Sequence, residues 1–598
     1  MAVGVDTGGT FTDVVRGDGR VLKVPSTPRD PSRAVADALQ RVGRPDLLAH
    51  GTTVATNALL ERRGARVALV TTLGFADVIE IARQDRPALY DQWTDRPEPL
   101  VPRELRLEVA GRLDASGAQL EPLARELPTV PAGVEALAVC LLHSDLDESQ
   151  ERELTERLAP LGLPVWRSSQ VSPEFREYER TVTTVVSAHL GPTCRDYLAR
   201  LATMADSVLV MTSAGGLVPV DQAAAKPATL LLSGPAGGVQ AGAAAAAGAG
   251  YPDVITFDMG GTSTDVCLVR NGVPEPAGQR TIAGLPLRLP ALDIHSIGAG
   301  GGSIARIDPG GALAVGPQSA GADPGPACYG RQDTTATVTD ADLVAGRIPA
   351  GTDFPGIGPL DDRAARRALD HGAMDAEGVI EVVDAAMEQA LRVVSVQRGV
   401  DPRSLALVAF GGAGPLHACA LADALDMAAV VVPPRAGVLS AVGLLCSPRQ
   451  ADLVRSWPTP GSVDGLSQAL AELGRHAAEE VVSDEVAAED RADVVVETAV
   501  DCRYAGQSHE LTVPAPEEFP AEHHRRNGFS RPGAPVEVVA LRARATVPAI
   551  FTEEDLGRPP TRQPATGPCV VAEPDCTLWI PDGWRAEVAP DGAWVLKR

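Results

Sequence analysis

The chain has 598 residues, of which 44% are hydrophobic and 22% are charged, and its formal net charge is −25. Because single hydrophobic cores stop growing near ~250–300 residues, this length predicts several domains. The strong negative charge argues against binding to nucleic acid or to an anionic membrane surface, because it would repel their phosphates.

Cysteine usage and the start of the chain indicate the compartment. The nine cysteines are scattered and form no C-x-x-C pair, which argues against a zinc site or a disulfide framework and favours free thiols. An apolar run begins directly after Met1, which leaves no room for a signal peptide, and the uncharged stretch 227–252 is broken by glycine and proline. We therefore expect a cytoplasmic protein that does not enter a membrane.

A glycine hairpin is predicted close to the N-terminus. The segment 6–13 reads DTGGTFTD and lies between the apolar runs 3–5 and 14–15, an arrangement typical of strand, tight turn and strand. Its two glycines allow backbone N–H groups to approach an anion, and its aspartates suit a magnesium ion or an attacking water molecule. The hairpin is therefore a candidate phosphate-binding loop.

The remainder of residues 1–185 has the pattern of an α/β unit. The expected elements are an amphipathic helix at 32–42, a glycine-threonine turn at 51–57, strands at 66–71 and 136–142, and a helix at 149–158.

Residues 186–455 have the pattern of a second α/β unit. Small residues follow the glycine-rich segment 233–238, which predicts a close-packed helix that starts at the glycines. A second strand–glycine–helix pattern places Gly411, Gly412 and Gly414 where free N–H groups can meet a polar ligand. The other expected elements are strands at 208–212 and 405–410, a glycine-dense turn at 297–303 and a helix at 382–398.

The hairpin sequence occurs a second time within this unit. The segment 258–265 reads DMGGTSTD and shares six of its eight positions with the first copy. One such turn is common in proteins, but two near-identical copies indicate a shared task. We expect the two hairpins to face each other across a cleft and to hold the phosphates of a nucleotide from both sides.

The composition changes near residues 456–461, where a proline-containing linker is expected. The following residues, 456–598, predict a smaller, mostly β domain with α+β composition. Its expected elements are an acidic helix at 466–488 and strands at 494–500, 510–513, 536–547 and 569–571.

Several long segments together make the chain similar to the A-type subunit of the hydantoinase/5-oxoprolinase family, within the actin-like ATPase superfamily. The segments that carry this resemblance are 6–13, 51–81, 233–239, 257–266, 293–308, 321–330 and 409–419. The resemblance implies an α/β fold with two actin-like (ribonuclease H-like) ATPase lobes flanking a nucleotide cleft. In that scheme residues 1–185 form the N-terminal lobe, 186–455 the central ATPase lobe and 456–598 the C-terminal domain.

The resemblance also implies an activity, ATP-dependent hydrolysis of a cyclic amide such as a hydantoin, 5-oxoproline or another lactam. The amide oxygen would be phosphorylated to create a leaving group. The implied cofactors are ATP and Mg²⁺, with Mn²⁺ or K⁺ as alternatives to Mg²⁺. The implied partner is a separate B-type subunit in a hetero-oligomer. A related branch of the family uses ATP to carboxylate ketones, and a nucleotide-binding partner without catalysis is a third reading.

Site residues follow from the matched motifs. The candidate catalytic residues are Asp6, Asp13, Asp258, Asp265, Asp293 and His295. The candidate nucleotide-binding residues are Thr7, Gly8, Gly9, Thr10, Thr12, Gly260, Gly261, Thr262, Thr264, Gly411, Gly412 and Gly414.

Some roles stay open at this level. Asp6 and Asp258 are the candidates for holding magnesium, through waters, whereas Asp13 and Asp265 could instead lock the hairpins by accepting backbone hydrogen bonds. Asp293 and His295 could face substrate or metal, or form a structural pair.

A few further positions are candidate ligand contacts or expected surface residues. Thr52, Thr53 and Asn57 are candidates for contact with phosphate or substrate, whereas His523 and His524 are expected to be surface residues. Ala214 and Ser187 stand where the family commonly has asparagine, which leaves the identity of the substrate open.

Overall fold

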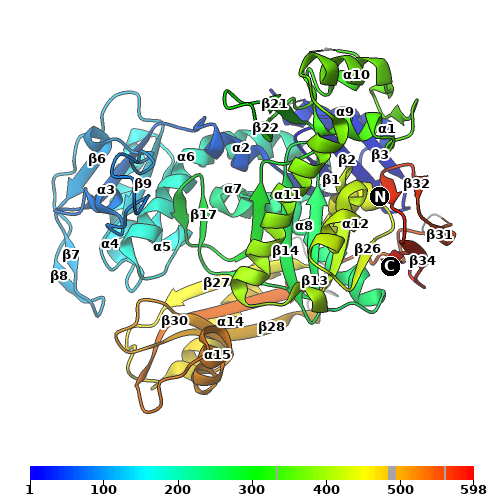
Figure 1. Cartoon of the computed structure of the whole chain (residues 1–598). Coiled ribbons are helices and arrows are strands. Elements are labelled where there is room, and N and C mark those ends of the chain that lie inside the picture. Colours follow the sequence, from blue (N-terminus) through cyan, green and yellow to red (C-terminus); the bar gives the residue numbers. More distant parts are fainter. Residues whose placement is uncertain (28, 332–333, 483–492, 558–560) are drawn as a thin grey trace.

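The computed structural model describes residues 1–27, 29–331, 334–482, 493–557 and 561–598, and it shows an α/β fold built on two large mixed sheets (Figure 1). The first sheet has ten strands. In spatial order they are β29 (Leu511–Val513), β28 (Val495–Tyr504), β30 (Val536–Val547), β27 (Arg449–Ser456), β12 (Leu217–Pro219), β11 (Ser207–Met211), β4 (Leu47–Thr52), β1 (Ala2–Thr7), β2 (Phe11–Arg16) and β3 (Val21–Pro25).

The second large sheet has nine strands. In order they are β15 (Val273–Pro274), β14 (Thr264–Arg270), β13 (Val254–Met259), β25 (Ala406–Phe410), β26 (Ala429–Val432), β35 (Trp594–Lys597), β34 (Arg585–Val588) and β31 (Ala565–Thr566), with β20 (Ile294–Ile297) beside β14.

The two sheets repeat one pattern of pairing. β1 pairs antiparallel with β2 and parallel with β4, which in turn runs parallel to β11. β13 likewise pairs antiparallel with β14 and parallel with β25, which runs parallel to β26. The central strands are buried on both faces and are therefore almost continuously apolar. The repeated hairpin sequence thus occupies equivalent positions in two equivalent lobes.

Helices cover both sheets. Those of the first lobe are α1 (Pro31–Val42), α2 (Val54–Leu60), α3 (Val78–Ile81), α4 (Ser149–Leu158), α5 (Ser168–Val171), α6 (Glu177–Ala202) and α7 (Val220–Ala225). Those of the second lobe are α8 (Ser233–Gly248), α9 (Val338–Val344), α10 (Asp362–His371), α11 (Ala376–Val394), α12 (Gly414–Ala424) and α13 (Leu439–Cys446).

The predicted small-residue helix is α8, which packs against α13 between the lobes. A Cβ on Gly443 of α13 would overlap with the carbonyl of Gly237 of α8, and a Cβ on Gly237 would come within 2.9 Å of the Ser440 carbonyl oxygen. The absence of side chains at these positions therefore permits direct contact between the two helix backbones. Since α13 also contacts β1 and β4, the pair joins the two lobes.

A third sheet lies to the left in Figure 1 and is entirely parallel. Its strands are β10 (Val165–Arg167), β9 (Ala136–Cys140), β5 (Val67–Thr72) and β6 (Arg106–Val109). The long helix α6 packs against this sheet and against α2 and α7. The predicted domain boundary between residues 185 and 186 falls inside α6, and β11 and β12 continue the first sheet. The division into domains stays a prediction.

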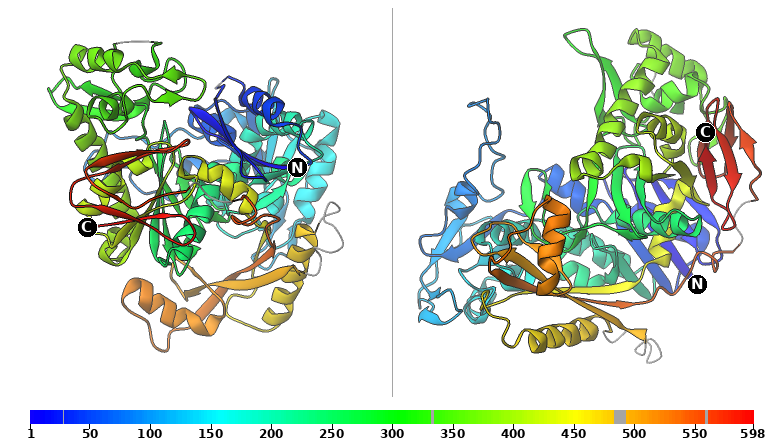
Figure 2. Two further views of the ribbon diagram at one scale, coloured as in Figure 1. Left: turned by 90° about the vertical axis from the view of Figure 1, so that its right-hand side faces the viewer. Right: turned by 60° about the horizontal axis from the view of Figure 1, so that its bottom comes forward.

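The C-terminal region is mostly β, as predicted, with the helices α14 (Leu466–Val481) and α15 (Phe519–Asn527). The sequence indicated only the first helix, whose predicted end after residue 482 lies outside the described residues. In both views of Figure 2 the orange segment around α15 lies apart from the last, red strands. This is because β28–β30 extend the first sheet whereas β31, β34 and β35 extend the second.

Six short strand pairs lie outside the three larger sheets. They are β7 (Arg112–Leu113) with β8 (Gln119–Glu121), β16 (Pro276–Ala277) with β19 (Ala291–Leu292), β17 (Arg280–Ile282) with β18 (Leu285–Leu287), β21 (Ser303–Ile307) with β22 (Leu313–Ser319), β23 (Asp353–Phe354) with β24 (Gly358–Pro359), and β32 (Cys569–Ala572) with β33 (Thr577–Ile580). No helix in the described part of the chain has the length and apolar character needed to cross a bilayer.

Candidate active site

The two repeated segments form hairpins with the same register. In the first hairpin Asp6 lies opposite Asp13, and the N–H of Gly8 donates to the Phe11 carbonyl at 3.0 Å. In the second hairpin Asp258 lies opposite Asp265, and the N–H of Gly260 donates to the Ser263 carbonyl at 3.0 Å. Strand pairing therefore places two aspartates opposite each other at the base of each turn.

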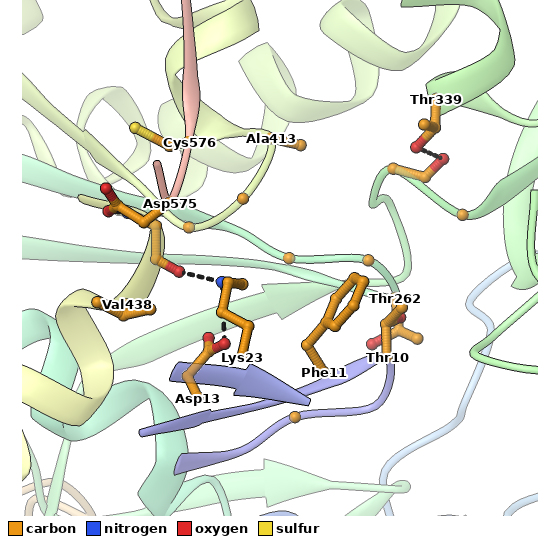
Figure 3. Close-up of a pocket in the computed structure, with 18 of the residues that line it drawn as sticks. Thr10, Phe11, Asp13, Lys23, Thr262, Thr339, Ala413, Val438, Asp575 and Cys576 are labelled. Atoms are coloured by element: carbon orange, nitrogen blue, oxygen red, sulfur yellow. Dashed lines mark hydrogen bonds and ion pairs between the residues drawn. The ribbon is translucent and has the colours of Figure 1, made fainter. Parts of the chain in front are cut away.

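The tips of the two hairpins touch. A Cβ on Gly9 would come within 2.9 Å of the Thr262 side chain, and a Cβ on Gly261 would overlap with the Thr10 hydroxyl. Figure 3 shows Thr10 and Thr262 against each other, at the opposite side of the cavity from Lys23. Both glycines are thus required for the close approach of the two lobes.

The turns offer donors that the fold itself does not use. Among the described residues, no carbonyl or side chain accepts from the backbone N–H groups of Gly9, Thr10, Gly261 and Thr262. These residues line the cavity, so their N–H groups are free to donate to a ligand there, and paired turns of this kind form an anion-binding concavity. The arrangement suits the oxygens of a triphosphate.

The glycine-dense loop between β20 and β21 supports the second hairpin from behind. The N–H groups of Gly301 and Gly302 donate to the carbonyls of Gly260 and Gly261, at 3.0 and 2.7 Å. The hydroxyl of Thr339, in α9, in turn donates to the Gly301 carbonyl at 2.8 Å. This loop therefore fixes the position of the second turn.

One cavity of about 240 Å³ lies between the lobes and brings most of the predicted residues together. The predicted residues that line it are Asp6, Gly8, Gly9, Thr10, Asp13, Thr53, Asp258, Gly260, Gly261, Thr262, Asp265, Gly411 and Gly412.

The four aspartates form a mutually repelling cluster. Burial, together with the charge of Asp13, raises the pKa of Asp6 to about 7. Burial likewise raises the pKa of Asp265 to about 6 and holds that of Asp258 well above its ordinary value. The pKa of Asp13 is also raised by burial, although the neighbouring Lys23 opposes the shift. The cluster is therefore unfavourable in its fully charged form unless a cation balances it.

Lys23 was not predicted, and it is the only lysine or arginine among the described residues that line the cavity. Its ammonium group lies 2.9 Å from Asp13 and donates to the Gly437 carbonyl at 2.6 Å (Figure 3). Lys23 lies opposite Asp13 in the pairing of β2 with β3. Strand alternation after the hairpin is the signal that could have identified it.

The chemistry of the cluster fits a divalent cation. Asp6 and Asp265 each have a buried Oδ1 atom without a hydrogen-bond partner among the described residues, whereas the Oδ1 atom of Asp13 is paired with Lys23. Carboxylate oxygens are the ligands that Mg²⁺ prefers, alone or through water. Asp258 is further held by the hydroxyl of Ser440, at 3.3 Å.

The other end of the cavity is apolar and begins at the predicted glycine turn. A Cβ on Gly411 would overlap with Asp258 and with the Met259 carbonyl, and its φ of +80° favours glycine. Beyond the turn the wall is formed by Leu416, Ile348, and the rings of Tyr329 and Phe354, which meet edge to face at 6.1 Å. Such a wall suits the base of a nucleotide.

A buried charge cluster holds the helix that follows this turn. His417 of α12 is fully buried, with Nδ1 2.7 Å from Asp384 and Nε2 3.4 Å from Asp342. Burial alone would lower the pKa of His417, but the two carboxylates raise it to about 10. Since Asp342 also lines the cavity, the cluster joins α9, α11 and α12 beside the cavity.

Replacing His417 by glutamine is expected to destabilise the protein by about 3–5 kcal/mol at pH 6, because a buried ion pair loses one partner. The folded pKa of His417 lies above its unfolded value near 6.5. This stabilisation is therefore complete below pH 6.5 and is lost as the pH rises through 10. Chemical denaturation between pH 6 and 10 measures both effects. His371→Gln, at an exposed position, is the control, and unchanged stability of the His417 variant at pH 6 would contradict this assignment.

Several predicted residues lie outside the cavity. Thr7, Thr12 and Thr264 are buried behind the hairpins, where Thr12 pairs with Ser26 at 3.1 Å and Thr264 donates to the Ala299 carbonyl at 2.6 Å. Gly414 is buried in the first turn of α12. These residues shape the turns, since strand alternation and helix packing direct them away from the cleft.

Asp293 and His295 are also not among the residues that line the cavity. The carboxylate of Asp293 forms an ion pair with Arg398, and His295 lies on β20 opposite Val266. Burial and the charge of Arg398 lower the pKa of His295. The structure thus favours the alternative of a structural role, because β20 pairs with the far side of the second hairpin.

The remaining threonine, asparagine and histidine candidates differ in how deeply they are buried. Thr52 is buried, and Asn57 is exposed on α2. His524 is exposed as expected, whereas His523 is buried against the rings of Tyr504, Phe519 and Phe529, because α15 presents it to the sheet. All nine cysteines are free thiols.

Known proteins are similar to this chain in both sequence and fold. Residues 180–452 match the family described as Hydantoinase/oxoprolinase, and residues 2–161 match the Hydantoinase/oxoprolinase N-terminal region. An uncharacterized protein of Methanocaldococcus jannaschii is 36% identical, covering 93% of this chain and 88% of that protein. The chain belongs to the hydantoinase/oxoprolinase family.

Other members of the hydantoinase/oxoprolinase family carry functional names. The caprolactamase subunit alpha of Pseudomonas jessenii is 31% identical, with 99% of this chain and 98% of that protein covered. The crystal structure of the ATP-dependent caprolactamase from that organism has a TM-score of 0.82, with both chains covered in full and 30% identity. The 5-oxoprolinase 1 of Arabidopsis thaliana is 34% identical over 79% of this chain, which spans only 43% of that protein.

Proposed function

We propose that this chain is the ATP-using subunit of an enzyme that hydrolyses a cyclic amide, and that it acts with a B-type partner chain. The observation that carries the proposal is the contact between two equivalent hairpins around one cavity, with unused N–H donors and four converging carboxylates. The names of the related caprolactamase and 5-oxoprolinases support the substrate class.

The cleft suits phosphoryl transfer, which depends mainly on alignment and charge neutralisation. The turn N–H groups of both hairpins would hold the triphosphate, and Lys23 would add one positive charge beside Asp13. Mg²⁺, held by Asp6 and Asp258, would neutralise the charge on the transferred group. Tyr329, Phe354 and Leu416 would enclose the base.

The proposed reaction makes an amide carbon reactive. The γ-phosphoryl group moves to the amide oxygen, and ADP leaves. Water then adds to the activated carbon, and the ring C–N bond breaks as the nitrogen takes a proton. Attack of a second water at the resulting acyl carbon releases phosphate, which carries the original amide oxygen, and leaves a carboxylate.

An isotope experiment tests this sequence of steps. A lactam or hydantoin labelled with ¹⁸O at the amide oxygen is incubated with ATP, Mg²⁺, this chain and its B-type partner. We expect one labelled oxygen in the inorganic phosphate for each ring opened. Unlabelled phosphate would exclude the proposed bond cleavage, and absence of ATP turnover with every cyclic amide would end the proposal.

A second candidate function is the energising subunit of a ketone carboxylase. The acetophenone carboxylase gamma subunit of Aromatoleum aromaticum is 33% identical over 74% of this chain. ATP turnover that requires bicarbonate and a small ketone, with no response to lactams, would favour this alternative.

A further inference from the structure

A long irregular loop leaves the first lobe between α3 and the short helical turn at Arg103–Leu105. Residues 82–102 contain no helix or strand. Loops longer than about 12–15 residues without secondary structure are uncommon in compact domains, and they are generally either functional or linkers between domains. Both ends of this loop belong to one folded unit, so a linker role does not apply.

The base of the loop is firmly attached. Arg83 donates to the buried carboxylate of Glu179 at 2.8 Å, and Arg96 donates to the carbonyls of Asp85 and Ile81 at 2.9 and 2.7 Å. At the returning end, Arg62 donates to the Glu98 carbonyl at 2.7 Å. These contacts fix where the tip of the loop emerges from the protein.

The tip carries large apolar side chains that the fold leaves uncovered. Leu89, Tyr90 and Trp93 are 70%, 97% and 83% exposed, the three highest values among the large hydrophobic side chains of the described residues. The carboxylate of Asp91 accepts from the Trp93 N–H at 2.9 Å and so closes a local turn between the two rings. Clustered exposed aromatic side chains are typical anchors of protein interfaces.

The lengths of the relatives support a second chain as the partner of this one. This chain spans 98% of the caprolactamase subunit alpha, but only 43% of the Arabidopsis thaliana 5-oxoprolinase 1 and 49% of the Saccharomyces cerevisiae 5-oxoprolinase. The two 5-oxoprolinases therefore contain an additional length of chain about equal to this one. The caprolactamase chain, which has no such addition, is named as a subunit.

We propose that residues 89–93, which we term the aromatic tip, dock into an apolar pocket of the B-type partner chain. This inference rests on the two-chain function proposed above, and it adds the place where the second chain binds. Tyr90 and Trp93 are the anchoring side chains, and the fixed loop base presents them with little further loss of freedom. The net charge of −25 disfavours an anionic membrane surface as the occupant.

The test compares the affinity of variants of the full chain for the purified B-type chain of the same organism. Trp93→Ala is expected to weaken binding by about 30-fold, the loss typical of an interface anchor. Val273→Ala removes an apolar side chain that is 64% exposed on β15, and it is expected to leave the affinity unchanged. ATP binding by the isolated Trp93 variant should equal that of the wild type, because Trp93 does not line the cavity.

The outcomes separate this proposal from the proposed function. If the wild-type chain binds the B-type chain and Trp93→Ala binds it equally well, the docking site is wrong while the two-chain function stands. If the wild type does not bind at all, both fail. The choice of partner would be overturned if the isolated wild-type chain self-associates or binds lipid vesicles and the Trp93 variant does not.

Discussion

Replacing Asp6 by asparagine is expected to reduce ATP turnover by at least about 100-fold while it stabilises the nucleotide-free protein. The loss follows because Asp6 is proposed to hold the Mg²⁺ that neutralises the transferred phosphoryl group, and removing one preorganised electrostatic contact of this kind costs on the order of 10²–10³-fold. The gain follows because Asp6 is buried next to Asp13 and its pKa is raised to about 7. A variant that is more stable and yet inactive would separate a role in the reaction from a role in folding.

The sign of the stability effect follows from proton binding. Between pH 3.8 and about 7 the folded protein holds a proton on Asp6 that the unfolded chain releases. Stability therefore falls as the pH rises through this window, by an amount on the order of 2–4 kcal/mol when complete. Asparagine cannot ionise, so the free energy of unfolding of the variant should not fall in this pH window. The variant should therefore be more stable than the wild type at pH 8.

Denaturation curves at pH 5 and pH 8, together with steady-state ATP hydrolysis, measure both effects. Asp37→Asn, at an exposed position of α1, removes the same charge away from the cleft and should change neither. Turnover of the Asp6 variant close to that of the wild type would contradict the assignment, as would a lower stability at pH 8. If the wild type itself binds ATP without turnover, the chain is a nucleotide-binding partner without catalysis.

The hairpins were predictable because their signal is local. Two glycines, flanking strand residues and an aspartate at each base determine the turn and the opposition of Asp6 with Asp13 without help from the rest of the chain. The repetition of the sequence then indicated that two such turns act together. The structure confirms that both lie in one cavity.

The residues that sequence reasoning missed are brought in by tertiary packing. Ser440 reaches Asp258 only because α13 packs on α8 across the two lobes, and Asp342 meets His417 only because α9, α11 and α12 converge. Conversely, Asp293 and His295 are close to the glycine loop in sequence, but β20 carries them away from the cleft. Proximity along the chain is a poor guide wherever a strand separates two residues from a turn.

Gly300→Ala is expected to reduce turnover with ATP by about 100-fold, because displacement of reacting groups by about 1 Å has that effect. A Cβ at this position would lie 2.7 Å from the Thr262 nitrogen and 2.9 Å from the Gly260 carbonyl oxygen. Both neighbours are backbone atoms of the second hairpin, so no side chain can rotate to make room. The hairpin or the loop must move, and the hydrogen bonds from Gly301 and Gly302 to the hairpin move with it.

The matched control is Gly461→Ala, because a Cβ there meets no atom within 4 Å. Both substitutions add one methyl group to a glycine without positive φ. A difference in turnover or stability between the two variants therefore reports the effect of the steric overlap behind the hairpin. Overpacking should also lower the stability of the Gly300 variant by about 1–3 kcal/mol, whereas the control should keep the stability and the ATP kinetics of the wild type. If Gly300→Ala turns over ATP as the wild type does, the turns need not be held in this geometry. The contact between Thr10 and Thr262 would then be a feature of packing rather than of phosphate binding.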